Sequence, residues 1–203
     1  MRRFVAIGSG NFQKQETLKI DQFIIQKTGK QNPKILFLPA AAKDDQGYGK
    51  RFKQYYRSLG CEVKQLRLWH TKLEKAQIQD CVLSCDILYL GGGNTTVLMQ
   101  ILKEKELLPI LKLAYQNGIV CVGNSAGANV WFDYGFSDLY DDGSVYAYVE
   151  GMHVISGIFY PHANDVQSKS KHQIPPISKL REYTCFKGEA LYFENEIMKT
   201  HLR

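Results

Sequence analysis

The sequence predicts an α/β fold with a doubly wound, mostly parallel sheet flanked by helices and a short β-hairpin region near the C-terminus. Three observations predict it. Short apolar runs alternate with longer amphipathic stretches up to about residue 133. Several runs end at glycines, as at Gly8-Ser9-Gly10 and Gly91-Gly92-Gly93. Strand–helix alternation of this kind is typical of βαβ units, whose strands are parallel and whose helices cover both faces of the sheet.

The apolar runs predict five strands in this region. Lys34–Leu38 is the clearest, because it begins after Pro33 and ends at Pro39. Asp86–Leu90 is nearly continuous in its apolar residues, which is typical of a strand buried on both faces. The predicted strands are Arg3–Ile7, Lys34–Leu38, Cys61–Leu66, Asp86–Leu90 and Ile119–Val122.

The stretches between these runs predict helices. Leu18, Phe23 and Ile24 fall on one face of the first, and Gly29 ends it, since glycine is favoured just past a helix C-terminus. The predicted helices are Thr17–Lys27, Tyr48–Leu59, Leu73–Leu83, Thr95–Leu102, Leu107–Asn117 and Ala126–Phe132.

The pattern changes after residue 133, where Asp133–Gly143 is polar and rich in turn residues. Two hairpins are predicted beyond it. One joins Val145–Val149 to His153–Phe159, and the other joins Tyr183–Phe186 to Ala190–Glu194 through Lys187-Gly188. No linker or repeat divides the 203 residues, so we expect a single domain over 1–203.

Composition narrows the class of protein and of partner. Hydrophobic residues at 44% and charged residues at 23% are ordinary for a globular chain and exclude a disordered or fibrous one. The formal net charge of +6 comes from scattered Lys and Arg, with no basic stripe or nucleic-acid-binding motif. We therefore expect no nucleic-acid and no membrane partner, and leave a homodimer open.

Cysteine usage and the N-terminus indicate the compartment. The five cysteines are odd in number and show no CxxC spacing, which favours reduced thiols in a cytoplasmic protein. The apolar run Phe4–Ile7 is too short for the core of a signal peptide. No Cys/His set has the spacing of a zinc site, so we expect no metal and no cofactor.

The stretch Gly123-Asn-Ser125-Ala-Gly127 is the most informative motif. It matches G-x-S-x-G between a predicted strand and a predicted helix, the context of a nucleophile elbow. Ser125 is then a candidate nucleophile, Gly123 and Gly127 avoid collisions around the tight turn, and the Ala126 N–H could donate to an oxyanion. The alternative is an ordinary glycine-rich turn in which the serine caps the helix.

A second glycine loop, Gly91–Thr95, follows the predicted strand Asp86–Leu90. Glycine lets a backbone approach a ligand closely, so Gly92 is a candidate second oxyanion donor. A phosphate-binding loop is the alternative, but the lysine of a P-loop and the G-x-G-x-x-G spacing are both absent.

A serine nucleophile needs a general base. Of the five histidines, His162 lies just after a predicted apolar strand, in Pro161-His-Ala-Asn-Asp165, where α/β sheets place catalytic loops. The competing positions are His70, His153, His172 and His201.

The motifs GGGNT (Gly91–Thr95), GNSAGAN (Gly123–Asn129) and PHAND (Pro161–Asp165) together resemble the peptidase E family of serine peptidases, which includes aspartyl dipeptidases and the related cyanophycinases. The resemblance implies a fold similar to class I glutamine amidotransferases. It also implies Ser125 as nucleophile, His162 as general base and the N–H groups of Gly92 and Ala126 as oxyanion donors. We expect Gly93, Asn94 and Asn124 to contact substrate.

The third member of the triad is open. The family's Glu-Gly turn corresponds to Phe186-Lys-Gly-Glu-Ala190. Without a gap Lys187 falls on the position of the acid, whereas a shift by two residues gives Glu189, which we favour because a carboxylate must orient the imidazole. Asp138 competes, and Asp165 is a third option. Where aspartyl dipeptidases carry an Arg for the acidic substrate side chain, this chain has Pro175-Pro176, and the nearest Arg is Arg181.

The sequence thus predicts a serine-type peptidase that hydrolyses short peptides through a Ser-His-acid triad and an acyl-enzyme. Whether the substrate's first residue is acidic is left open. Two alternatives remain. One is an amidotransferase-like enzyme, although Ser125 replaces its usual cysteine and Cys121 falls inside a strand. The other is a non-catalytic relative that binds a small ligand or partner.

Overall fold

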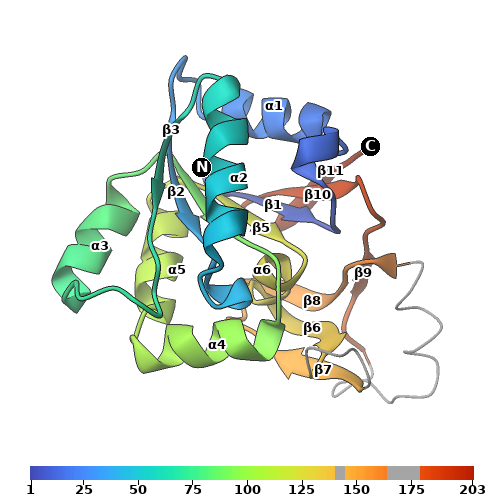
Figure 1. Ribbon diagram of the computed structural model, residues 1–203. Helices are drawn as coiled ribbons and strands as arrows, with labels where there is room; N and C mark the ends of the chain where they lie inside the picture. The colour runs from blue at the N-terminus through green and yellow to red at the C-terminus, as the bar shows by residue number, and fades with distance from the viewer. Residues whose placement is uncertain (140–144, 164–178) are drawn as a thin grey trace.

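The computed structural model describes residues 1–139, 145–163 and 179–203 (Figure 1). Its main layer is a seven-stranded sheet in the order β11-β10-β1-β5-β4-β2-β3. The strands β1, β5, β4, β2 and β3 are parallel, and β10 runs antiparallel to both β1 and β11. The seven strands are β1 (Arg3–Ile7), β2 (Lys34–Leu38), β3 (Glu62–Gln65), β4 (Ile87–Leu90), β5 (Val120–Asn124), β10 (Ala190–Glu194) and β11 (Ile197–Leu202).

Helices cover both faces of this sheet, so the predicted doubly wound architecture is confirmed. Phe37 and Val122 belong to an apolar cluster with α1 and α2 on one face, while Leu36 and Cys121 belong to a second cluster with α3 to α6 on the other. The alternation follows from the two-residue period of a strand. The helices are α1 (Leu18–Lys27), α2 (Gln46–Ser58), α3 (Lys75–Leu83), α4 (Thr95–Glu104), α5 (Leu108–Gln116) and α6 (Ala126–Asn129), with 3-10 turns η1 (Phe12–Lys14) and η2 (Ala40–Ala42).

A second, four-stranded sheet lies beside the first, with strand order β7-β6-β8-β9 (Figure 1). Its strands β6 and β7 are antiparallel, whereas β6, β8 and β9 are parallel to one another. The four strands are β6 (Phe132–Asp138), β7 (Tyr146–Glu150), β8 (Ile155–Tyr160) and β9 (Glu182–Thr184).

The sequence prediction is wrong at three places in this region. The helix expected over Ala126–Phe132 ends at Asn129, because Phe132 already belongs to β6, which was expected to be turn. The strands β7 and β8 form no hairpin, since β6 lies between them. The strands β9 and β10 form none either, because β9 joins the small sheet and β10 joins the large one.

A C-terminal hairpin is nevertheless present, and it joins β10 to β11. It turns at Asn195 and Glu196, whose φ angles are 48° and 66°. Two consecutive positive φ angles are the signature of a type I′ turn, which matches the twist of the flanking strands.

The strand order determines at which edge of the large sheet the loops that carry the candidate site residues meet. The strands β1, β5 and β4 are adjacent and parallel, so their carboxyl ends lie at one edge of the sheet. Ligands bind at that edge in doubly wound folds. In residues 1–139, 145–163 and 179–203, each helix is too short or too polar to serve as a transmembrane span.

Candidate active site

Ser125 follows β5 directly and adopts a strained backbone, with φ 51° and ψ −112°. A positive φ is unusual for a residue other than glycine and persists only where the surroundings hold it. Three backbone hydrogen bonds do so. The N–H of Ser125 donates to the Ile7 carbonyl at 2.9 Å, and its own carbonyl accepts from Ala128 and Asn129 at 2.8 and 3.0 Å. This is the geometry of a nucleophile elbow.

The two glycines of the motif are required by space. A Cβ at Gly123 would overlap the carbonyl oxygen of Gly127, and a Cβ at Gly127 would overlap the carbonyl oxygen of Leu90 at the end of β4. The start of α6 therefore packs directly on the ends of β5 and β4, as the sequence predicts.

His162 faces the serine from the loop after β8. The Ser125 Oγ and the His162 Nε2 are 2.8 Å apart, within hydrogen-bond reach of a nucleophile and its base. The loop is fixed on both sides of the histidine, because Ala163 donates to the Cys185 carbonyl at 3.2 Å and Cys185 donates to the Tyr160 carbonyl at 3.0 Å. The structure thus joins two residues that the sequence selected independently.

Ser125 and His162 open into a cavity of about 430 Å³ between the two sheets. Its described lining contains four aromatic side chains and one carboxylate, that of Asp138, and no lysine or arginine. The lining residues are Ser9, Gly10, Phe12, Tyr48, Gly92, Gly93, Asn124, Ser125, Phe136, Ser137, Asp138, Tyr146, Pro161 and His162.

The predicted oxyanion donors both lie beside the serine. Ala126 is the first residue of α6, so its N–H has no acceptor within that helix. Gly92 is close enough that a Cβ on it would lie 3.7 Å from the Cβ of Ser125. However, the Gly92 N–H donates to the hydroxyl oxygen of Tyr48 at 3.2 Å.

The predicted substrate contacts divide into two groups. Gly93 and Asn124 line the cavity with Ser125. Asn94 does not line it: its Oδ1 accepts from the Val97 N–H at 3.1 Å and so caps the N-terminus of α4. The structure therefore gives Asn94 a role in starting a helix, as the N-cap preference for asparagine explains.

Glu189, the favoured third acid, has other partners in the structure. Its carboxylate pairs with the His201 Nε2 at 2.7 Å and the Arg203 Nε at 3.2 Å. The sulfur of Cys185 lies nearby, so ligand atoms of Cys185, Glu189 and His201 fall within 4.8 Å of one another. Burial raises the pKa of the Cys185 thiol to about 12, which disfavours the thiolate that a metal would need.

Asp138, the competing acid, lies at the end of β6 and lines the cavity with His162. A chain of hydrogen bonds reaches it from the elbow helix: Asn129 Nδ2 donates to Thr95 Oγ1, Thr95 to Ser137 Oγ, and Ser137 to Asp138 Oδ1, at 2.9, 2.9 and 3.1 Å. The first three side chains are buried. Each hydroxyl accepts one bond and donates the next, which orients the whole chain toward the carboxylate.

The other candidates from the sequence either lie away from the cavity or fall outside the described residues. Asp165, His172 and Pro175-Pro176 fall outside the described residues. Arg181 stacks on the Tyr183 ring at 5.0 Å rather than lining the cavity. His153 is exposed and pairs with Asp133 and Glu150.

Sequence reasoning missed Tyr48 and the buried polar chain. Tyr48 comes from the first turn of α2, and Thr95 and Ser137 come from α4 and β6. Tyr48 and Ser137 stand in no motif, and although Thr95 ends the GGGNT motif, nothing in that motif predicts its bond to Ser137; only the packing of distant elements brings these side chains together.

Comparison with known proteins agrees with this geometry. Residues 4–192 match the sequence family described as peptidase family S51. The chain belongs to peptidase family S51. It is therefore a serine peptidase, and the predicted resemblance to peptidase E is confirmed.

Individual relatives of this family S51 peptidase support the assignment. Uncharacterized peptidase YgaJ of Bacillus subtilis (strain 168) is 32% identical over 200 residues, covering 97% of this chain and 85% of that protein. The protein named probable alpha-aspartyl dipeptidase of Drosophila melanogaster is 37% identical over 97 residues, covering 47% of this chain and 38% of that protein.

Solved structures confirm the fold. A crystal structure of a peptidase from an acI-B1 Actinobacterium has a TM-score of 0.72 and 19% identity, covering 95% of this chain and 83% of that one. A Listeria monocytogenes EGD-e protein provisionally described as peptidase E has a TM-score of 0.73 and 17% identity, covering 100% and 98%. At these identities the likeness concerns the fold alone.

Proposed function

We propose that this family S51 member hydrolyses short peptides, dipeptides among them, through Ser125 and His162. The observation that carries the proposal is the 2.8 Å contact between Ser125 Oγ and His162 Nε2 at a strained elbow that opens into a cavity. A relative named alpha-aspartyl dipeptidase supports the size class of the substrate.

The mechanism follows from the positions of the two side chains. Neutral His162, with its proton on Nδ1, accepts the Ser125 hydroxyl proton at Nε2 while Oγ bonds to the scissile carbonyl carbon. The negative charge that forms on the carbonyl oxygen is assigned to the Ala126 N–H and to the loop at Gly92. His162 then protonates the leaving amine, and water hydrolyses the acyl-enzyme by the reverse sequence of proton transfers.

The acid that orients the His162 ring is also proposed, and two carboxylates are candidates for it. Glu189 is the acid that the sequence analysis favours, and its carboxylate binds His201 and Arg203. Asp138 is supported by its place in the cavity with His162 and by the directed hydrogen-bond chain that ends on it. Parallel Glu189→Gln and Asp138→Asn variants distinguish them, because removing the triad acid lowers kcat by about 10⁴-fold.

The charged groups that line the cavity indicate which peptide side chains it accepts. An acidic substrate side chain finds no lysine or arginine in the described lining, whereas Asp138 offers a partner for a free amino group. We therefore expect cleavage not to be confined to peptides that begin with aspartate.

A panel of dipeptides that begin with Asp, Ala, Leu or Phe tests this function, with amine release as the readout. Wild type should cleave at least one, and Ser125→Ala should lose about 10⁴-fold or more in kcat/KM. Ser125→Ala that retains wild-type turnover would refute the assigned nucleophile. Cleavage of the Asp dipeptide alone would show that an acidic first residue is required.

A further inference from the structure

Tyr48 holds a fixed position at the wall of the active-site cavity. Its ring stacks on Phe12 with centroids 5.9 Å apart and meets Phe37 edge-on at 5.2 Å. Its Cε1 also lies against Gly91, where a Cβ would come within 3.0 Å. Enclosed by two rings and a backbone, this side chain has little freedom to rotate away.

The hydroxyl of Tyr48 occupies the backbone donor that the family resemblance assigns to the oxyanion. Its oxygen accepts from the Gly92 N–H at 3.2 Å. The Asn124 amide nitrogen is also near Gly92, 3.4 Å from the position that a Cβ on Gly92 would take. In this arrangement Gly92 cannot donate to a substrate oxygen unless the phenol moves.

The proton of that hydroxyl is free to serve the substrate. A phenol oxygen carries one proton and can accept from other donors at the same time. Among the described residues, the hydroxyl interacts with the Gly92 N–H and with the Asn124 side chain, both of which lower the pKa of Tyr48 as groups that donate to its oxygen do. This leaves the proton available, and Tyr48 lines the same cavity as Ser125 and His162.

We infer that Tyr48 is an oxyanion-hole residue: its O–H donates to the oxyanion that forms when Ser125 attacks, while the Gly92 N–H donates to Tyr48 and orients it. The inference rests on the proposed function. It changes the assignment of Gly92 from a direct donor to a group that positions and polarises the donor.

The attack on the carbonyl needs no reactant other than the peptide, Ser125 and His162. The Ser125 Oγ–carbon bond forms, the carbonyl π electrons move to the oxygen, and the serine proton goes to His162 Nε2. Tyr48 keeps its own proton and donates only a hydrogen bond. Burial raises the pKa of Tyr48, so the hydroxyl stays protonated throughout the pH range in which a histidine acts as base.

Tyr48→Phe tests the inference, because it removes the hydroxyl and keeps the packed ring. The assay uses the amino-acid p-nitroanilide that wild type cleaves fastest among Asp, Ala, Leu and Phe. We expect kcat to fall by about 10²–10³-fold and KM to change by less than about threefold, since an oxyanion donor acts in the transition state. The inhibition constant of a peptide boronic acid, whose adduct places an oxygen in the oxyanion position, should rise by a similar factor.

Tyr55→Phe is the matched control. Tyr55 lies on the same helix, but its hydroxyl donates to Asp21 at 2.8 Å and does not line the cavity. Its kcat should equal that of wild type. An unchanged kcat in Tyr48→Phe would overturn the inference. An increased kcat would overturn it too, because it would mean that the hydroxyl only blocks the Gly92 N–H. Ser125→Ala assayed in parallel separates the two failures, because full activity there would refute the proposed function itself.

Discussion

At the scale of single residues, the elbow depends on two glycines and one strained serine. Ser125 is at φ 51°, and the backbone of α6 approaches the ends of β4 and β5 too closely for any Cβ at Gly123 or Gly127. These three residues are predictable from sequence, because the motif encodes a steric requirement. Tyr48 is not, since its hydroxyl reaches Gly92 only through the packing of α2 on the sheet.

Gly127→Ala should lower the free energy of unfolding by about 2 kcal/mol or more, since the added methyl overlaps a carbonyl that belongs to the packed end of β4. Gly47→Ala is the matched control in α2. There the methyl meets the end of the flexible Arg51 side chain, and alanine favours the helix, so stability should be unchanged or rise by up to about 1 kcal/mol. Urea unfolding measures both, and equal losses in the two variants would contradict the steric account.

At the scale of elements, the local hydrophobic pattern predicts the strands of the parallel sheet but not the strands and pairing of the small sheet. The predicted ranges of β1 and β2 match the structure residue for residue, because buried parallel strands are continuous apolar runs bounded by breakers. The strand β6 reads as turn because polar and glycine residues interrupt it, and its pairing with β8 is a long-range contact. The two expected hairpins are wrong for a related reason. The strands expected to pair do not pair with each other, because β6 lies between β7 and β8 while β9 and β10 join different sheets.

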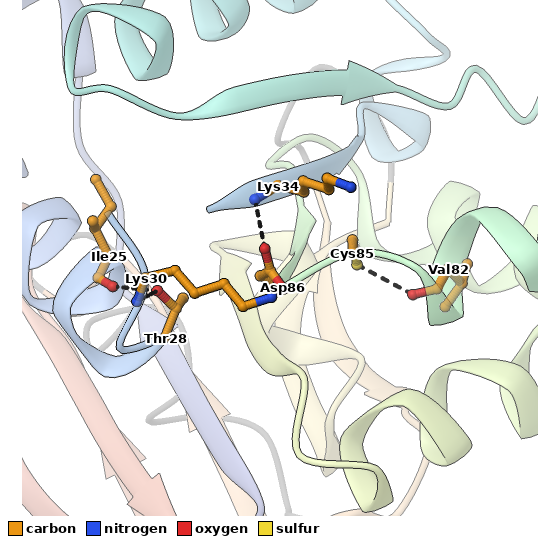
Figure 2. Close-up of polar contacts among 7 residues, drawn as sticks. All are labelled: Ile25, Thr28, Lys30, Lys34, Val82, Cys85 and Asp86. Carbon is orange, nitrogen blue, oxygen red and sulfur yellow. Dashed lines mark hydrogen bonds and ion pairs between the residues drawn. The ribbon is translucent and has the colours of Figure 1, made fainter. Parts of the chain in front are cut away.

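Asp86 shows how one side chain joins elements at the amino ends of the strands. Its carboxylate lies between the Lys34 N–H at the start of β2 and the Lys30 ammonium (Figure 2). It accepts from the first at 2.8 Å and pairs with the second at 2.6 Å. Burial alone would raise the pKa of Asp86, but Lys30 and the Lys34 N–H outweigh it and hold the pKa below its usual value. The carboxylate therefore ties the loop after α1 and the start of β2 to β4.

Asp86→Ala should lower the free energy of unfolding at pH 7 by about 0.5–1.5 kcal/mol, because it removes the carboxylate that accepts from the Lys34 N–H. Lys30→Ala removes only an exposed partner and should cost less than about 0.5 kcal/mol. Since the folded pKa is depressed, the contribution is present above about pH 4 and is lost as the pH falls through the folded value. Denaturant titrations at several pH values should show wild type and Asp86→Ala converging in acid, and a constant difference would contradict the assignment.

At the scale of the whole molecule, the topology brings together residues from five separate segments. Adjacent parallel strands deliver the loops at Gly10, Gly92 and Ser125 to one edge of the large sheet, and the small sheet delivers Asp138 and His162 to the same cavity. The sequence selected the proposed nucleophile and base, Ser125 and His162, since each stands in a motif at a strand end. It left the third acid open, because a match to a family motif does not show which carboxylate lies beside the His162 ring in the folded chain.

The central claim is that Ser125 is a nucleophile activated by His162. Reaction with a fluorophosphonate, followed by peptide mapping with mass spectrometry, tests it most directly because the probe needs no knowledge of the substrate. We expect one phosphonate on Ser125 in the wild type and none in Ser125→Ala. In His162→Gln, labelling should slow by about 10³-fold or more, since the serine loses its base. Absence of label on Ser125 in the folded wild type, or labelling that proceeds equally fast without His162, would contradict the account.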